Sequence, residues 1–277
     1  MLIRSTEKEH DFTNRLFERL KLFSIQGLTM SADKHWTAGV EAIQYDDNET
    51  VQLERIFPIV QVKAKYYLSK TLGIPFYYVI WQKGVFKVFN IWFDDQGRFC
   101  SSQEHEFDEY GYVSWWSTLK GLPQPKPLLE KASIRVQRSV FDIALEKHDM
   151  AWGGNIDGYM FKHKQFACIV ENIYTYKHPL ESERGEPSYY FFKQGPNYNT
   201  WFPTVTLAHQ LGIPLFLFTI NGNTNDDRIG FTVIDHLESS GIYYRDNLKP
   251  NNNIIAGIDN IEKVVLSHLD QKPPYIK

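Results

Sequence analysis

The chain has 277 residues, of which 43% are hydrophobic and 23% charged, a balance typical of a folded protein with one large domain or two small ones. Its formal net charge of -3 argues against an extended basic surface of the kind that covers nucleic acid. The N-terminus has no secretory signal, the apolar runs are too short to span a bilayer, and the two cysteines lack metal-ligand spacing, so we expect a cytoplasmic protein without membrane contact.

The first half of the chain alternates helical and strand patterns. The predicted helices and strands lie, in order, at residues 6–23 (helix), 39–45 and 57–64 (strands), 65–72 (helix), and 76–81 and 85–93 (strands). The first helix places Phe12, Leu16 and Leu20 on one face. Asp46-Asp47-Asn48 favours a hairpin turn between the first two strands, and Gly73 should end the second helix.

A proline-rich stretch at 121–128 has no periodicity and is predicted to link two domains, at 1–120 and 129–277. The second half then repeats the alternation. Its predicted elements lie at 129–147 (helix), 156–162 and 167–174 (strands), 201–211 (helix), 215–220 and 229–234 (strands), and 258–269 (helix). In the first of these helices, Ile134, Phe141 and Leu145 should face inward.

Landmarks recur in the same order in both halves. Leu72-Gly73-Ile74-Pro75 and Leu211-Gly212-Ile213-Pro214 each precede an apolar strand. Upstream of each tetrapeptide lie two further pairs that we align with one another: Val60-Gln61 with Val170-Glu171, and Val40-Glu41 with Ile156-Asp157. The order predicts an internal repeat of one α/β unit, with a long insertion before the second helix of the second copy.

The second half offers two carboxylates on neighbouring predicted strands. Asp157 begins one strand and Glu171 lies on the next. Two such carboxylates can hold one or two divalent cations, and a nearby lysine can position or deprotonate the attacking water. Phosphodiester hydrolysis needs this combination, because the anionic phosphate repels hydroxide until its charge is neutralised.

This arrangement resembles the PD-(D/E)XK, or restriction-endonuclease-like, nuclease superfamily, whose core has the order α-β-β-β-α-β and whose motif is an acid followed by acid-x-lysine on the next strand. The resemblance covers most of both halves. It implies an α/β protein of two tandem restriction-endonuclease-like domains, each a mixed central sheet flanked by helices. Such a fused pair favours a monomer with an approximate internal two-fold, although an edge strand leaves pairing with another chain open.

In the second half the match to the motif is partial. The resemblance implies that Asp157 and Glu171 bind Mg²⁺ or Mn²⁺. Ile173 stands where the lysine belongs, so a neighbour must replace it, and we assign Lys177 as the stand-in, with Lys162 as the other candidate.

The first half matches the motif differently. Glu41 takes the first acid position, and Gln61-Val62-Lys63 takes the acid-x-lysine position, with an amide in place of the second acid. Glu41, Gln61 and Lys63 therefore predict either a scaffold or a second, weakened site.

Three functions follow from these patterns. The first is a Mg²⁺-dependent nuclease that acts on nucleic acid, DNA in preference to RNA. The second is a catalytically inactive pseudo-nuclease that binds nucleic acid or protein, and the third is an unrelated α/β enzyme acting on a small molecule. The aromatic residues 189–192 either stack on bases or form a lid over their own sheet.

Overall fold

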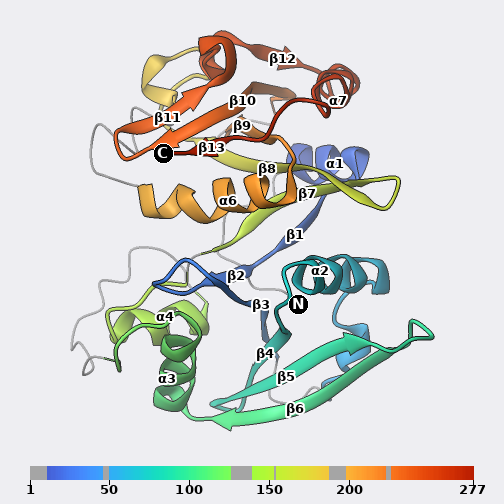
Figure 1. Ribbon diagram of the computed structural model, residues 1–277, viewed down its shortest axis with the longest axis vertical. Helices are drawn as coiled ribbons and strands as arrows, with labels where there is room; N and C mark the ends of the chain where they lie inside the picture. The colour runs from blue at the N-terminus through green and yellow to red at the C-terminus, as the bar shows by residue number, and fades with distance from the viewer. Residues whose placement is uncertain (1–10, 46–49, 126–138, 153, 187–197, 223–225) are drawn as a thin grey trace. The chain divides into compact units, whose positions relative to one another are not determined.

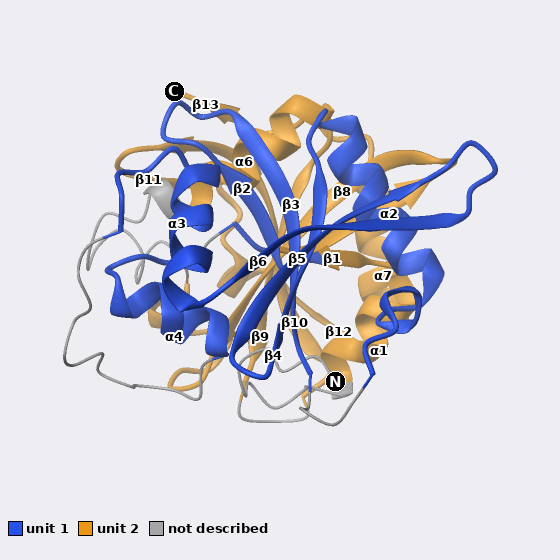
Figure 2. Ribbon diagram, turned by 90° about the horizontal axis from the view of Figure 1, so that it is seen from below, with its two compact units in different colours: residues 1–8, 25–155 blue, residues 9–24, 156–277 orange. Residues whose placement is uncertain are grey.

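The computed structural model describes residues 11–45, 50–125, 139–152, 154–186, 198–222 and 226–277, and the chain forms two compact units (Figure 1). Unit 1 takes in the described residues of 25–155, and unit 2 those of 11–24 and 156–277 (Figure 2). The protein is α/β, with two mixed sheets of five and eight strands and six α-helices in the described part of the chain. None of these described helices is long and apolar enough to cross a membrane.

The units divide the chain differently from the predicted domains at 1–120 and 129–277. Helix α1 (Asp11–Leu20) packs into unit 2, whereas α4 (Val140–Lys147), which follows the predicted linker at 121–128, packs into unit 1. Unit 1 is thus inserted within the sequence of unit 2. Spacing reveals that a helix has an apolar face, but it does not say which sheet that face covers.

The sheet of unit 1 has the strand order β2-β3-β4-β5-β6. The elements of unit 1 before α4 are β2 (Gly27–Met30), β3 (Trp36–Gln44), η1 (Leu53–Arg55), α2 (Ile59–Thr71), β4 (Phe76–Gln82), β5 (Val85–Phe93), β6 (Phe99–Phe107) and α3 (Glu109–Leu119). Only β3 and β4 run parallel, and the chain between them forms α2. Helix α2 contacts β3, β4 and β5, as expected for a crossover connection.

The core of unit 1 lies between the opposite face of this sheet and the helices α3 and α4. Strand residues such as Val40 and Phe86 pack there against Tyr112 of α3 and against Phe141 and Leu145 of α4. The inward positions predicted for Phe141 and Leu145 are confirmed, but the sheet that they cover belongs to unit 1. The third predicted position, Ile134, lies outside the described residues.

The sheet of unit 2 has the order β1-β7-β8-β9-β10-β11, and β12 and β13 also pair with β10. After α1, its elements are β1 (Phe23–Ile25), β7 (Ile156–Lys162), β8 (Gln165–Thr175), η2 (Glu183–Gly185), α6 (Tyr198–Leu211), β9 (Leu215–Asn221), β10 (Arg228–Glu238), β11 (Gly241–Tyr244), η3 (Arg245–Asn247), η4 (Pro250–Asn252), β12 (Ile254–Ala256), α7 (Ile258–Ser267) and β13 (Tyr275–Ile276). Strands β8 and β9 run parallel, and α6 lies in the segment between them.

Helices cover both faces of the unit 2 sheet. Helix α6 contacts β8, β9 and β10, while α1 and α7 pack together on the opposite face (Figure 1). Phe12, Leu16 and Leu20 are buried in that second layer, at 1%, 0% and 4% exposure, which confirms the predicted apolar face of the first helix. Phe23, the last residue of the helix predicted at 6–23, lies beyond the end of α1 and begins β1.

Most predicted strands are confirmed, and one is wrong. Those at 76–81, 85–93, 156–162, 167–174, 215–220 and 229–234 correspond to β4, β5, β7, β8, β9 and β10. The strand predicted at 57–64 is largely helical, because α2 begins at Ile59 after Pro58. Its β-branched residues favour a strand, but the buried positions Val62, Lys65 and Leu68 follow helical spacing. The antiparallel partner of β3 is β2 and not the segment at 57–64.

The aromatic residues 189–192 lie outside the described part of the chain.

The repeated tetrapeptide ends the crossover helix in both units. Gly73 and Gly212 both have a φ of 69°, the left-handed conformation that glycine adopts without strain after a helix. Pro75 and Pro214, two residues after these glycines, directly precede β4 and β9. Each unit therefore contains a β-hairpin, a crossover helix and a strand parallel to the hairpin's second strand, followed by an antiparallel strand.

We predict that Leu16→Ala destabilises unit 2 by about 2–5 kcal/mol, because the substitution leaves a cavity under a fully buried side chain. Hydrogen exchange measured by mass spectrometry should then accelerate in β8 and β9 more than in β3 and β4. Leu266→Ala on α7 is the control, since Leu266 is 45% exposed and its loss should change little. Faster exchange in β3 and β4 alone would contradict the assignment of α1 to unit 2.

Candidate functional site

The strand register aligns the two units residue by residue. In the parallel pair of unit 1, Gly39 lies opposite Phe76, and the Gly39 amide donates to the carbonyl of Pro75 at 2.9 Å. In unit 2, Ile169 lies opposite Leu215, and its amide donates to the carbonyl of Pro214 at 3.0 Å. Because both prolines close the repeated tetrapeptide, Gly39 and Ile169 are equivalent positions.

The equivalence places a glutamate at the same point of each parallel pair. Glu41 on β3 and Glu171 on β8 each lie two residues beyond the aligned position. Each accepts a hydrogen bond from the crossover helix: Lys65 Nζ of α2 donates to Glu41 Oε1 at 2.7 Å, and Thr204 Oγ1 of α6 donates to Glu171 Oε1 at 2.9 Å. Lys65 and Thr204 precede Leu72 and Leu211 by the same seven residues. They are therefore equivalent as well.

A third pair of equivalent residues lies on the first strand of each hairpin or just before it. Gly27 pairs with Val40, and Gly158 pairs with Val170, so the residues before these glycines, Gln26 and Asp157, correspond. Their side chains make the same contact. Gln26 Oε1 accepts from the amide of Ala42 at 2.8 Å, and Asp157 Oδ2 accepts from the amide of Asn172 at 2.9 Å. We call Gln26, Glu41 and Lys65 the unit 1 triad, and Asp157, Glu171 and Thr204 the unit 2 triad.

These triads correct the alignment made from sequence. Glu41 corresponds to Glu171 and not to Asp157. Gln61 and Lys63 are not on a strand beside Glu41; both are exposed residues of α2. The lysine that meets Glu41 is Lys65, and one signal could have revealed it: in a helical alignment it shares the apolar face of Val62 and Leu68.

The unit 1 triad is closed to solvent. The side chains of Glu41 and Lys65 are 1% and 5% exposed. The Lys65 ammonium also lies 4.9 Å from the ring centroid of Phe57, and the backbone N–H of Gln26 donates to Glu41 Oε1 at 3.0 Å. Burial of a charged pair is tolerated when the two charges are paired and hydrogen-bonded, so this triad has the properties of a structural contact.

Tyr78 of β4 lies close to the Glu41 carboxylate. Its ring is fully buried, and burial together with the charge of Glu41 raises the pKa of the Tyr78 hydroxyl well above its ordinary value. Within the described structure neither this hydroxyl nor Glu41 Oε2 has a hydrogen-bond partner. The Lys65 ammonium therefore satisfies one oxygen of Glu41 and leaves the other buried.

The unit 2 triad is more open and carries more negative charge. Asp157 and Glu171 are both partly exposed, whereas Thr204 is buried. When the register of Gly158 and Val170 is continued by one residue, Asp157 comes to lie opposite Glu171. Directly opposed residues of antiparallel strands project to the same face of a sheet. Here that is the face covered by α6, because Glu171 contacts Thr204.

The structure does not bring the assigned stand-in lysine to these carboxylates. Strand β8 continues for four residues past Glu171, or about 13 Å, before Lys177 follows as an exposed residue. Ile173 lies on β8 as expected from the sequence. Lys162 is at the end of β7 away from Asp157. Among the described residues of unit 2, no hydrogen bond or ion pair joins Lys177 or Lys162 to Asp157 or Glu171.

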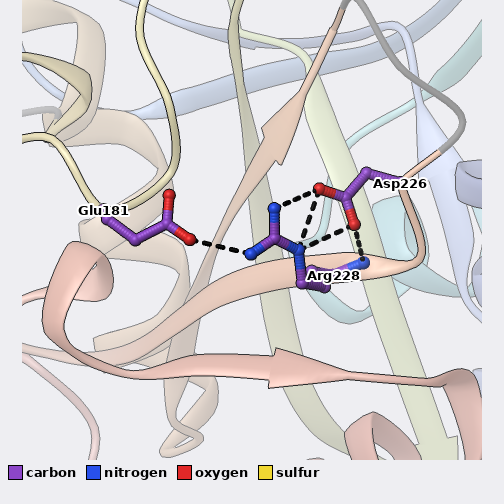
Figure 3. A network of polar contacts seen from close by, with 3 residues as sticks. All are labelled: Glu181, Asp226 and Arg228. Carbon is purple, nitrogen blue, oxygen red and sulfur yellow. Dashed lines mark hydrogen bonds and ion pairs between the residues drawn. The ribbon is translucent and has the colours of Figure 1, made fainter.

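Other carboxylates of unit 2 are engaged elsewhere. Arg228 at the start of β10 donates to Asp226 on one side, at 2.6 Å, and to Glu181 on the other, at 2.7 Å (Figure 3). The hydrogen bonds from Arg228 lower the pKa of Asp226. This network ties the segment after β8 to β10 and uses both acids in ion pairs.

The donor set of the unit 2 triad fits a hard divalent cation. Mg²⁺ is commonly bound through one or two carboxylates while it keeps several waters and takes phosphate oxygens from a substrate. Asp157 and Glu171 supply two carboxylates and Thr204 a hydroxyl. Among the described residues, no group of three or more histidine, cysteine, aspartate or glutamate side chains could hold a metal ion, so a dense protein cage of that kind is absent there.

Comparisons with known proteins add no relative: no protein-family model, no curated protein and no solved structure matches the chain.

We predict that Lys65→Met lowers the free energy of unfolding by about 3–5 kcal/mol, because it leaves the buried Glu41 carboxylate without its counter-charge. The double variant Glu41→Gln/Lys65→Met should recover most of the loss, since it removes both charges. Lys63→Met on the exposed side of the same helix is the control and should change stability by less than about 0.5 kcal/mol. Urea unfolding measures all three, and equal losses in the single and double variants would argue against a structural ion pair.

Proposed function

We propose that the protein is a divalent-metal-dependent nuclease of the restriction-endonuclease-like type, with its metal site at Asp157 and Glu171 of unit 2. The substrate class is nucleic-acid phosphodiesters, DNA in preference to RNA. The observation that carries this proposal is the pair of opposed, partly exposed carboxylates on β7 and β8, on the face beneath α6. Such a pair is a site for Mg²⁺ or Mn²⁺.

The element order of unit 2 supports the fold assignment. Helix α1, strands β1, β7 and β8, helix α6 and strand β9 follow one another as α-β-β-β-α-β once the inserted unit 1 is set aside. These four strands are consecutive neighbours in the sheet, in the order β1-β7-β8-β9. This is the order expected of the nuclease core, with the two acids on its second and third strands.

The proposed roles follow from the chemistry of phosphodiesters. When bound, the cation supplies a positive charge that draws in the scissile phosphate and lowers the pKa of a bound water. Asp157 and Glu171 would hold that cation, and the Thr204 hydroxyl orients Glu171 through its hydrogen bond. Unit 1 acts as a structural copy, because its glutamate is already paired with Lys65 and shielded from solvent.

A catalytically inactive binding protein is the second candidate, and one observation favours it. Two positions beside the unit 2 triad where a lysine would be expected hold uncharged residues: Ile173 on β8, and Thr204 on α6, which corresponds to Lys65 of unit 1. Without an ammonium near the attacking water, a metal-bound nucleic acid could be held and left uncleaved. The two candidates share the metal site and differ in turnover.

We predict that the wild type binds Mn²⁺ saturably and that Asp157→Asn or Glu171→Gln weakens binding by at least about tenfold, because each removes a charged ligand. Isothermal titration calorimetry provides the affinity and the stoichiometry. Glu183→Gln, at an exposed position of η2, is the matched control and should bind like the wild type. Wild-type protein that binds no Mn²⁺ would contradict the metal site.

Cleavage assays separate the two candidates. Single- and double-stranded DNA and RNA are incubated with Mg²⁺ or Mn²⁺, with Asp157→Asn as the negative control. Metal-dependent cleavage that this variant lacks would support the nuclease. Metal-dependent retention of an intact oligonucleotide, measured by fluorescence anisotropy, would support the binding protein instead.

A further inference from the structure

The two triads differ in charge at equivalent positions. Unit 1 has Gln26, Glu41 and Lys65, whose formal charges cancel, whereas unit 2 has Asp157, Glu171 and Thr204, whose formal charges sum to two negatives. The hydrogen bonds that place the triads are the same in both units, so the difference lies in the side chains and not in the backbone. Two substitutions, at the strand position and at the helix position, account for it.

In unit 1 a cation is visible at the glutamate. The Lys65 ammonium lies 2.7 Å from Glu41 Oε1, with both side chains almost completely buried. Glu41 Oε2 is also buried, and it has no hydrogen-bond partner in the described structure. The ammonium of Lys65 thus marks where a positive charge lies against this carboxylate, and the second carboxylate oxygen, Oε2, accepts no hydrogen bond in the described structure.

We infer that the Lys65 ammonium fills in unit 1 the cation position that a divalent metal ion fills in unit 2. The residue at this position of the crossover helix, lysine at 65 or threonine at 204, then decides whether a unit takes a metal ion. The inference rests on the proposed function for the metal in unit 2, and it adds that unit 1 carries its own substitute for that metal.

Size and charge support the exchange. An ammonium group and a hydrated divalent cation both satisfy carboxylate oxygens, but only the divalent ion balances the two carboxylates of unit 2. Thr204 contacts Glu171 through a neutral hydroxyl, so it adds no positive charge beside the carboxylate. Its side chain is also shorter than that of lysine. Conversely, unit 1 has the neutral Gln26 at the position equivalent to Asp157, so the single ammonium of Lys65 balances the charge of its one carboxylate.

The test introduces a lysine into unit 2. Thr204→Lys should weaken Mn²⁺ binding more than about 100-fold in calorimetric titration of the full-length chain, because the new ammonium competes with the metal for Glu171 and repels it. Thr204→Met, of similar length but without charge, is the matched comparison: it removes the hydroxyl that positions Glu171 but adds no cation, so its loss of Mn²⁺ affinity should be at least about tenfold smaller than that of Thr204→Lys. Unchanged Mn²⁺ affinity in Thr204→Lys, or equal losses in both variants, would overturn the inference.

The reverse exchange tests unit 1. Gln26→Asp/Lys65→Thr gives unit 1 the residues of the unit 2 triad, and the stoichiometry of Mn²⁺ should rise from one to two per chain. Folding of this variant is checked by far-UV circular dichroism, and a folded variant that still binds one ion would overturn the inference. Failure of the proposed function looks different, because the wild type itself would then bind no Mn²⁺.

Discussion

A glutamate held beneath a crossover helix is the contact on which both units depend. A parallel strand pair requires the chain to cross one face of the sheet, and the helix that makes the crossing covers the middle of the pair. A carboxylate lies at that point in each unit, fully buried in unit 1 and partly buried in unit 2, and such burial is costly unless a hydrogen-bonding partner is present. In unit 1 the Lys65 ammonium donates a hydrogen bond to this carboxylate, and in unit 2 the Thr204 hydroxyl does so.

The choice of partner sets what each unit can do. The ion pair of unit 1 is almost completely buried, which leaves no access for a substrate. A hydroxyl positions Glu171 without neutralising it, and the opposed Asp157 adds a second negative charge. We infer a division of labour in which one copy of the repeat contributes structure and the other contributes the candidate metal site.

Much of the fold could be predicted from the sequence, and the failures have physical causes. Apolar strands after each tetrapeptide were predicted correctly, because short runs bounded by turn residues are strong signals. The segment at 57–64 was predicted wrongly, because its β-branched residues favour a strand. Its helical spacing can be recognised only if Lys65 is counted as a buried position together with Val62 and Leu68. Strand β2 is only four residues long, and missing it shifted the alignment of the acids.

The site shows the same limits. Asp157 and Glu171 were singled out from the sequence, and continuing the strand register places them opposite one another, while their role as metal ligands stays a prediction. Thr204 and Gln26 could not be singled out, because a threonine in a helix and a glutamine before a short strand carry no signal by themselves. Their importance appears only when equivalent hydrogen bonds are compared across the two units.

Anomalous scattering from crystals grown with Mn²⁺ tests the central claim most directly. The triads predict one strong manganese peak between the carboxylates of Asp157 and Glu171 and none beside Glu41, where the Lys65 ammonium is seated. A peak at Glu41, or no peak at Asp157 and Glu171 at saturating Mn²⁺, would contradict the assignment of the cation site to unit 2.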